Sequence, residues 1–133
     1  MSETIKPYSY KVPAHVPPTR QLVLEISVRD IQRSIAFYQS LGFTLIRSEE
    51  HFAELGWEDS KLLLDERPAL IPSAVPAGNV RVMVADVDAL WQRCQTLGAT
   101  VYAEIADRYY GLRDFTILDP DGFGIRFASD LTR

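Results

Sequence analysis

Charged side chains interrupt three otherwise apolar predicted strands, at Glu25, Arg81 and Arg126. Successive side chains of a strand point to opposite faces, so each charge should lie on the face opposite its apolar neighbours. A carboxylate or guanidinium inside a cavity is costly unless another charge or a ligand compensates it. These residues predict an ion pair of Glu25 with one of the arginines and a site where an arginine holds a carboxylate or phosphate, and the two are compatible because a ligand could displace the pair.

Aromatic residues near strand ends and loops offer a second kind of chemistry. Trp57, Tyr109 and Tyr110 could form flat walls that stack against planar heterocycles. Phe115 lies on an alternating strand and is predicted to belong to the core. Asn79 should share the face of Arg81. The candidate ligand-binding residues are Glu25, Trp57, Asn79, Arg81, Tyr109, Tyr110 and Arg126.

Few residues suggest covalent or metal chemistry. Glu25 is the candidate catalytic base if the chain is an enzyme, because a buried carboxylate can acquire a pKa suited to proton transfer. Glu25, His51 and Asp65 could bind a metal only if the fold brought them together, and His51 is better explained as an exposed strand residue. Cys94 lies on the apolar stripe of a predicted helix, which indicates an inert buried thiol.

The elements that must position these residues occur twice along the chain. An alternating strand over 24–28 or 80–84 leads to an aspartate that is typical of a helix N-cap, and these residues, Asp30 and Asp86, are 56 positions apart. Each predicted helix ends at a glycine, Gly42 or Gly98, which tolerates left-handed backbone. Further strands are predicted over 43–47, 52–57 and 61–65 in the first copy, and over 100–104, 114–118 and 124–128 in the second, with a tight turn at DPDG, 119–122.

This plan predicts an α+β fold of two βαβββ modules, because a unit this small cannot bury both faces of its sheet alone. Residues 21–67 form the first predicted module and 79–133 the second, within one domain. The proline-rich segment 68–78 is predicted to link them. Residues 1–20, which contain four of the eight prolines, are predicted to be an extended arm.

Composition argues against some classes of partner and favours one cellular compartment. The formal net charge of −4 and the lack of a basic stripe argue against nucleic acid. No apolar stretch approaches the roughly 20 residues of a membrane span, so no membrane partner is expected. A single cysteine and an N-terminus unlike a signal peptide favour a soluble cytoplasmic protein.

Two segments, LEISVRDIQRSIAFYQSLGF and YGLRDFTILDPDGFGIRF, resemble the vicinal oxygen chelate superfamily, also called the glyoxalase/bleomycin resistance/extradiol dioxygenase group. The resemblance covers residues 22 to about 130 and is nearest to bleomycin-resistance-like members. It implies a curved mixed sheet of paired modules around a cleft. It also implies a homodimer in which the first module of one chain faces the second module of its partner.

The metal-dependent members of this superfamily have histidine, glutamine or glutamate at their ligand positions. The resemblance places those positions here at Val23, Leu63, Asn79 and Arg126. Valine, leucine and arginine do not bind divalent cations, and asparagine is a weak ligand at best. No metal and no cofactor are therefore predicted.

The resemblance and the missing ligands favour a metal-independent protein that sequesters a small molecule, with antibiotic resistance as a possible role. Under this hypothesis the protein binds its ligand without catalysis, so the sequence favours a binding protein over an enzyme. The alternative is a lyase, isomerase or dioxygenase-type enzyme with an unconventional metal site or none. A partner-binding or purely structural dimer with a vestigial cavity is a third hypothesis.

Overall fold

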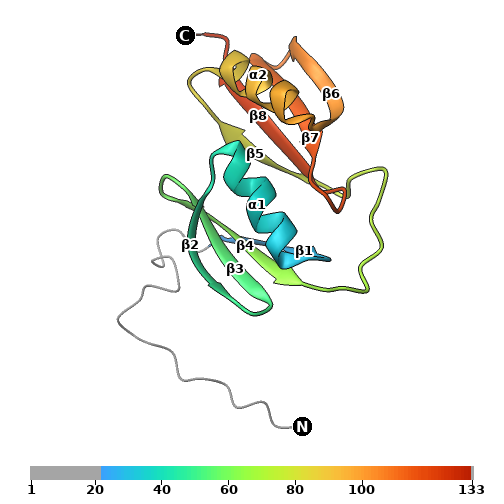
Figure 1. Ribbon diagram of the computed structural model, residues 1–133. Helices are drawn as coiled ribbons and strands as arrows, with labels where there is room; N and C mark the ends of the chain where they lie inside the picture. Colours follow the sequence, from blue (N-terminus) through green and yellow to red (C-terminus); the bar gives the residue numbers. More distant parts are fainter. Residues whose placement is uncertain (1–21, 133) are drawn as a thin grey trace, which may run out of the picture.

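The computed structural model describes residues 22–132, which form two modules of the same plan (Figure 1). The first module consists of β1 (Leu24–Val28), α1 (Ile31–Leu41), β2 (Thr44–Glu49), β3 (Phe52–Trp57) and β4 (Ser60–Glu66). The second consists of β5 (Asn79–Met83), α2 (Val87–Leu97), β6 (Thr100–Asp107), β7 (Leu112–Leu118) and β8 (Gly124–Asp130). The predicted arm, 1–20, lies outside the described residues.

The two sheets have matching strand orders. The order is β1-β4-β3-β2 in the first and β5-β8-β7-β6 in the second. In each sheet the opening strand pairs in parallel with the last strand of its module, and the other pairs are antiparallel. The predicted α+β fold of two βαβββ modules is therefore confirmed. The strands of residues 22–132 form two separate four-stranded sheets.

Both helices begin and end where the sequence predicts. The carboxylates of Asp30 and Asp86 accept hydrogen bonds from the backbone N–H three residues later, at 3.2 and 3.1 Å. These bonds satisfy donors that the first turn of a helix otherwise leaves unpaired. Gly42 and Gly98 follow the last helical residues with φ of 121° and 69°, a range that side chains with a Cβ rarely adopt.

The strands lie where they were predicted, but most are longer. β6 continues to Asp107, because the β6–β7 ladder extends to the pair formed with Arg113. β2 starts one residue late, since the N–H of Phe43 donates to the carbonyl of Tyr38 at the helix end. Sequence periodicity identifies such strands better than it identifies their ends.

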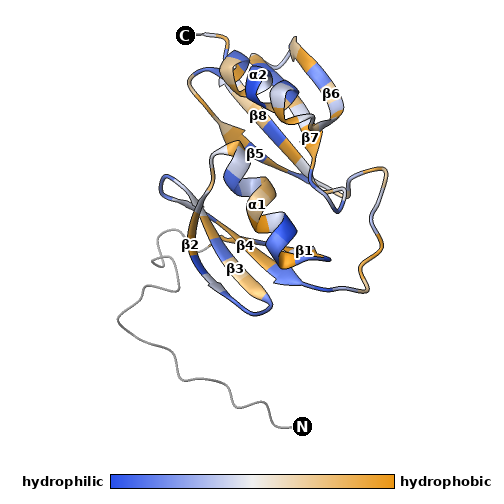
Figure 2. Ribbon diagram, in the orientation of Figure 1, coloured by the Kyte–Doolittle hydropathy of each residue, from blue (hydrophilic) through white to orange (hydrophobic). Residues whose placement is uncertain are grey.

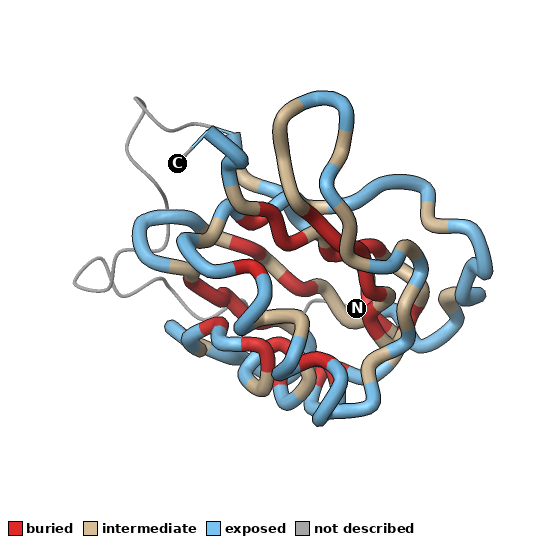
Figure 3. Tube along the Cα trace, turned by 90° about the horizontal axis from the view of Figure 1, so that it is seen from above, coloured by how far each residue is buried: buried red, intermediate tan, exposed pale blue. Residues whose placement is uncertain are grey.

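A single hydrophobic core is shared by the two modules. The Trp57 ring of the first module lies 5.7 Å from the Phe127 ring of the second, and Phe115 lies 5.5 Å from Phe127. Phe115 and Phe127 are fully buried, which confirms the core prediction for Phe115. Figure 3 shows the buried segments gathered in the interior, and Figure 2 shows hydrophobic and hydrophilic positions alternating along the strands.

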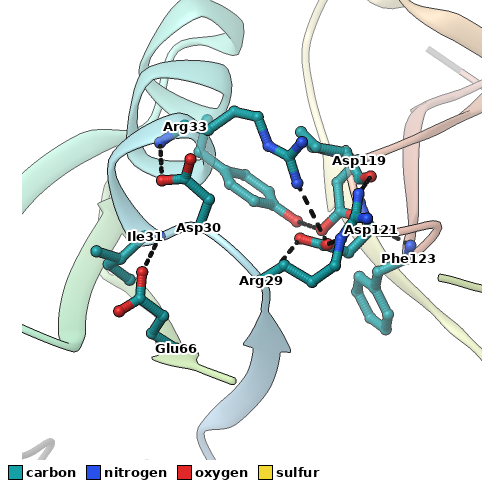
Figure 4. A network of polar contacts seen from close by, with 10 residues as sticks. Arg29, Asp30, Ile31, Arg33, Glu66, Asp119, Asp121 and Phe123 are labelled. Atoms are coloured by element: carbon teal, nitrogen blue, oxygen red, sulfur yellow. Dashed lines mark hydrogen bonds and ion pairs between the residues drawn. The ribbon is translucent and has the colours of Figure 1, made fainter. Parts of the chain in front are cut away.

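A polar contact fixes the two modules against each other at the 119–122 turn (Figure 4). The hydroxyl of Tyr38 on α1 donates to Asp119 Oδ2 at 2.8 Å. Arg29 and Asp121 form an ion pair of 2.7 Å beside it. Burial raises the pKa of the Asp119 carboxyl, and burial together with the nearby Asp119 charge raises that of Tyr38. The predicted turn is confirmed by a 3.0 Å bond from the N–H of Gly122 to the carbonyl of Asp119.

Neither helix in residues 22–132 has the length and apolar character needed to cross a bilayer.

Candidate functional site

Two arginines lie side by side on the second sheet, on the face away from the shared core. Arg81 of β5 and Arg126 of β8 are register partners on parallel strands, and Thr116 of β7 is the next residue in the same row. Their strand neighbours Val82 and Phe127 are buried in the core. Arg126 Nε donates to Thr116 Oγ1 at 3.2 Å. Strand alternation therefore points both arginines to one common face.

A buried carboxylate adjoins this row. Asp114 of β7 is 2% exposed and accepts from Arg108 Nε at 2.8 Å and from the Tyr110 hydroxyl at 2.6 Å. The hydrogen bond to Asp114 raises the pKa of Tyr110, with smaller contributions from burial and from the Asp114 charge. The guanidinium carbon of Arg81 lies 6.0 Å from the Tyr110 ring centroid, within the range of a cation–π contact.

Tyr109 stands beside this cluster at the turn between β6 and β7. Its side chain is 100% exposed, and its ring packs edge-on against Tyr110 with centroids 5.1 Å apart. The next residue, Gly111, has φ 88°, so the hairpin turn uses the left-handed region. The turn leaves an aromatic ring free to meet a ligand.

The matching face of the first module carries different chemistry. By the repeat, Glu25 corresponds to Arg81, and the next two residues in its row are Leu63 and Glu54. The side chain of Glu54 is 2% exposed and lies between Arg47 Nε at 3.0 Å and Lys61 Nζ at 2.9 Å. This face therefore has Glu25 and Leu63 where the second module has Arg81 and Arg126, and the neutralised carboxylate of Glu54 stands where the second module has Thr116.

Glu25 does not form the predicted ion pair in this structure. Its side chain lies on the exposed part of β1, and within residues 22–132 no ion pair joins it to Arg81 or Arg126. The arginines therefore stand without that carboxylate inside one chain, and the ligand-binding alternative stays a prediction.

Two further candidates lie apart from the arginine row. Trp57 packs on the core side of β3, where its ring is 5.0 Å from Phe43, and is not brought together with Tyr110. Asn79 is exposed at the start of β5 and pairs with Gly124 of β8, two residues before Arg81 and Arg126 in each strand. By strand alternation it lies on the same face as the arginines, but in a different cross-strand row.

The residues at the superfamily's ligand positions do not fit a divalent cation. Leu63 is apolar, and Arg126 brings a positive charge. His51 pairs with Glu66 at 2.6 Å, and Asp65 pairs with Arg67 at 2.8 Å. In the described part of the chain no three His, Cys, Asp or Glu side chains gather as metal ligands.

Cys94 has the properties predicted from its place on the helix. It is fully buried, and burial raises the pKa of its thiol to about 11. A thiol with this pKa stays protonated near neutrality and is a poor nucleophile.

Sequence reasoning missed Arg108, Asp114 and Thr116 as members of this cluster. The available signal was Asp114, a carboxylate next to the core residue Phe115 on a predicted strand. An acidic residue at such a position needs a partner, and the partners Arg108 and Tyr110 lie just before it in the chain.

Residues 20–127 match the model of the Glyoxalase/Bleomycin resistance protein/Dioxygenase superfamily, and the chain belongs to this family. A Bleomycin resistance protein of Geobacillus stearothermophilus is 32% identical, and the match covers 84% of this chain and 97% of that protein. A Bleomycin resistance protein of Staphylococcus aureus gives the same values, 32%, 84% and 97%.

Solved structures support the fold. A bleomycin resistance determinant encoded on the transposon Tn5 superposes with a TM-score of 0.71 at 22% identity, covering 83% of this chain and 97% of that one. A bleomycin-binding protein complexed with bleomycin gives 0.70 at 22% identity, covering 83% and 98%. A lactoylglutathione lyase from Agrobacterium tumefaciens gives 0.69 at 19% identity, covering 85% and 95%, so the fold alone does not separate binding proteins from enzymes.

Proposed function

We propose that this chain is a small-molecule-binding protein that sequesters its ligand, and that the ligand is an antibiotic of the bleomycin type. The observation that carries the proposal is the 32% identity to Bleomycin resistance proteins over 97% of their length. The aromatic and arginine-lined face of the second module supports it, because planar ligands bind between aromatic walls and a few polar groups.

Binding is proposed to need neither metal nor cofactor. At the superfamily's ligand positions the chain has Val23, Leu63, Asn79 and Arg126, which are unsuited to a cation. The site is then formed by protein groups alone. A reducing cytoplasm is the proposed compartment, in keeping with the single buried thiol of Cys94.

The proposed assembly is a homodimer with two clefts. Each cleft would form between the first module of one chain, 21–67, and the second module of its partner, 79–133, with 68–78 as the link within each chain. Among residues 22–132 the opening strands β1 and β5 each pair on one side only, and they carry the exposed apolar residues Leu24 (39%) and Met83 (51%). Unpaired edges with apolar side chains favour pairing with a second chain.

Light scattering in dilute solution is expected to give a mass near twice the 15.0 kDa of one chain. A mass that stays at 15.0 kDa over a wide concentration range would contradict the dimer and its shared clefts. Ligand binding by such a monomer would locate the site within one chain.

Calorimetric titration with metal-free bleomycin is expected to show saturable binding of one ligand per chain, unchanged by chelator treatment of the protein. An aminoglycoside of similar positive charge but without aromatic rings is the control, and it should bind far more weakly if the aromatic wall matters. Absence of heat with bleomycin would contradict the proposed ligand. Binding that chelator abolishes would contradict metal independence.

A further inference from the structure

We propose that Arg81 and Arg126 form an oxyanion-binding site on the second module, which takes a carboxylate or similar group carried by a planar ring. This inference rests on the proposed function, because it names the chemistry of a ligand bound at the same face. It adds a feature that a cationic antibiotic does not require.

The arginine pair carries positive charge that no carboxylate in the described part of the chain balances. Arg81 and Arg126 are direct register partners on neighbouring parallel strands, which lie about 4.8 Å apart. Like charges at such positions repel each other. In the described part of the chain neither arginine has an ion-pair partner, and the adjoining Asp114 is already paired with Arg108. Of the three guanidinium groups in this cluster only that of Arg108 has a carboxylate partner, and a bound anion would offset the excess positive charge.

Arg126 is anchored by a buried hydroxyl group. Its Nε donates to the hydroxyl of Thr116, which is 1% exposed, so the base of the guanidinium is held in place. Both terminal nitrogens of Arg126 remain available at the end of the fork. Two parallel N–H donors in this arrangement match the two oxygens of a carboxylate. Because Arg126 is half-buried, a contact there is less screened than one on the open surface.

Tyr109 and Tyr110 form an aromatic border beside the arginines, which indicates a planar carrier for the anion. The hydroxyl of Tyr110 is held by Asp114 at 2.6 Å, which fixes the ring beside Arg81. The fully exposed ring of Tyr109 extends this border outward. A flat ring could stack on these side chains while its carboxylate reaches the arginines.

The first module supplies an internal comparison. At the positions equivalent to Arg81 and Arg126 it has Glu25 and Leu63, and the buried Glu54 there already has two cationic partners. An anion would meet a carboxylate and an apolar side chain at those positions. The site therefore belongs to the second module alone, and it would set the direction in which an asymmetric ligand lies.

The experiment compares naphthoate with its neutral analogue naphthamide by calorimetric titration of the full-length protein. We expect naphthoate to bind about tenfold more tightly, the size of one charge-assisted contact. The variant Arg126→Ala should lose this preference, and Arg126→Lys, which keeps the charge without the fork, should retain part of it. Arg113→Ala is the matched control, because Arg113 lies on β7 but has its own partners, Asp88 and Asp107.

Several outcomes would overturn the inference. Equal affinity for naphthoate and naphthamide would show that charge is not recognised. An equal loss in Arg113→Ala and Arg126→Ala would indicate unspecific attraction by positive charge. A folded Arg126→Ala variant that binds naphthoate normally but changes from dimer to monomer would assign the arginine to the subunit contact. Melting curves of each variant confirm that it is folded.

The same titrations separate this inference from the proposed function. If bleomycin binds and naphthoate does not, the oxyanion site is wrong and the antibiotic-binding function stands. If naphthoate binds through Arg126 and bleomycin does not, the oxyanion site stands and the proposed ligand is wrong.

Discussion

Replacing Asp119 by alanine is expected to lower the free energy of unfolding by about 3 kcal/mol. The Asp119 side chain accepts three hydrogen bonds, from the Tyr38 hydroxyl at 2.8 Å and from the N–H groups of Asp121 and Phe123 at 2.8 and 2.9 Å. Asp119 is 5% exposed, so the donors left without an acceptor would have little access to water. Each buried unsatisfied donor costs about 1–3 kcal/mol, and removing the buried charge of Asp119 offsets part of the sum.

Tyr38→Phe is the control, because it removes only the hydroxyl that joins the two modules and leaves the turn intact. It should cost about 1 kcal/mol, the size of one hydrogen bond. Urea unfolding of both variants at one protein concentration gives the comparison. If Asp119→Ala proves no more costly than Tyr38→Phe, the carboxylate does not hold the turn through its backbone bonds.

The difference in the free energy of unfolding between the native protein and Asp119→Ala should increase as the pH falls. Burial raises the pKa of Asp119 in the folded chain above its value in the unfolded chain. The folded state therefore binds a proton more readily than the unfolded state. As the pH falls through the folded pKa, the native protein should gain stability relative to Asp119→Ala, and this gain should be complete below the unfolded pKa.

Gly122→Ala is expected to lower the free energy of unfolding by about 3 kcal/mol, more than Gly111→Ala, which should cost about 1 kcal/mol. The two glycines have nearly equal φ, 89° and 88°, so their backbone strain on substitution is similar. They differ in surroundings. A Cβ at position 122 would clash with the backbone carbonyl of Ser73 and lie 3.1 Å from its nitrogen, whereas nothing lies within 4 Å of a Cβ at position 111.

The difference in free energy of unfolding between the two glycine variants measures the cost of disturbing the contact between the 119–122 turn and the segment that links the modules. Thermal or urea unfolding provides the measurement, with the two variants compared under identical conditions. Similar losses in both would mean that the segment around Ser73 moves away freely, and the close approach would then contribute nothing to stability.

Local patterns determined most of the fold. Asp30 and Asp86 cap helices, Gly42 and Gly98 end them, and alternating apolar residues form the strands, because each of these effects depends on residues a few positions apart. The repeat of 56 positions then predicted two equivalent modules, and the structure confirms them. Strand alternation also placed Arg81 and Arg126 on one face, since that requires only the register of two adjacent strands.

The tertiary structure alone decided which distant groups meet. Tyr38 and Asp119 are 81 positions apart, and nothing in either local sequence indicates their hydrogen bond. Trp57 entered the core instead of joining Tyr110, because the second module supplies Phe127 as a packing partner. Glu25 remained exposed and apart from the arginines, because the strands in the described part of the chain form two separate sheets. Such pairings depend on how the modules pack, and sequence periodicity carries no information about that geometry.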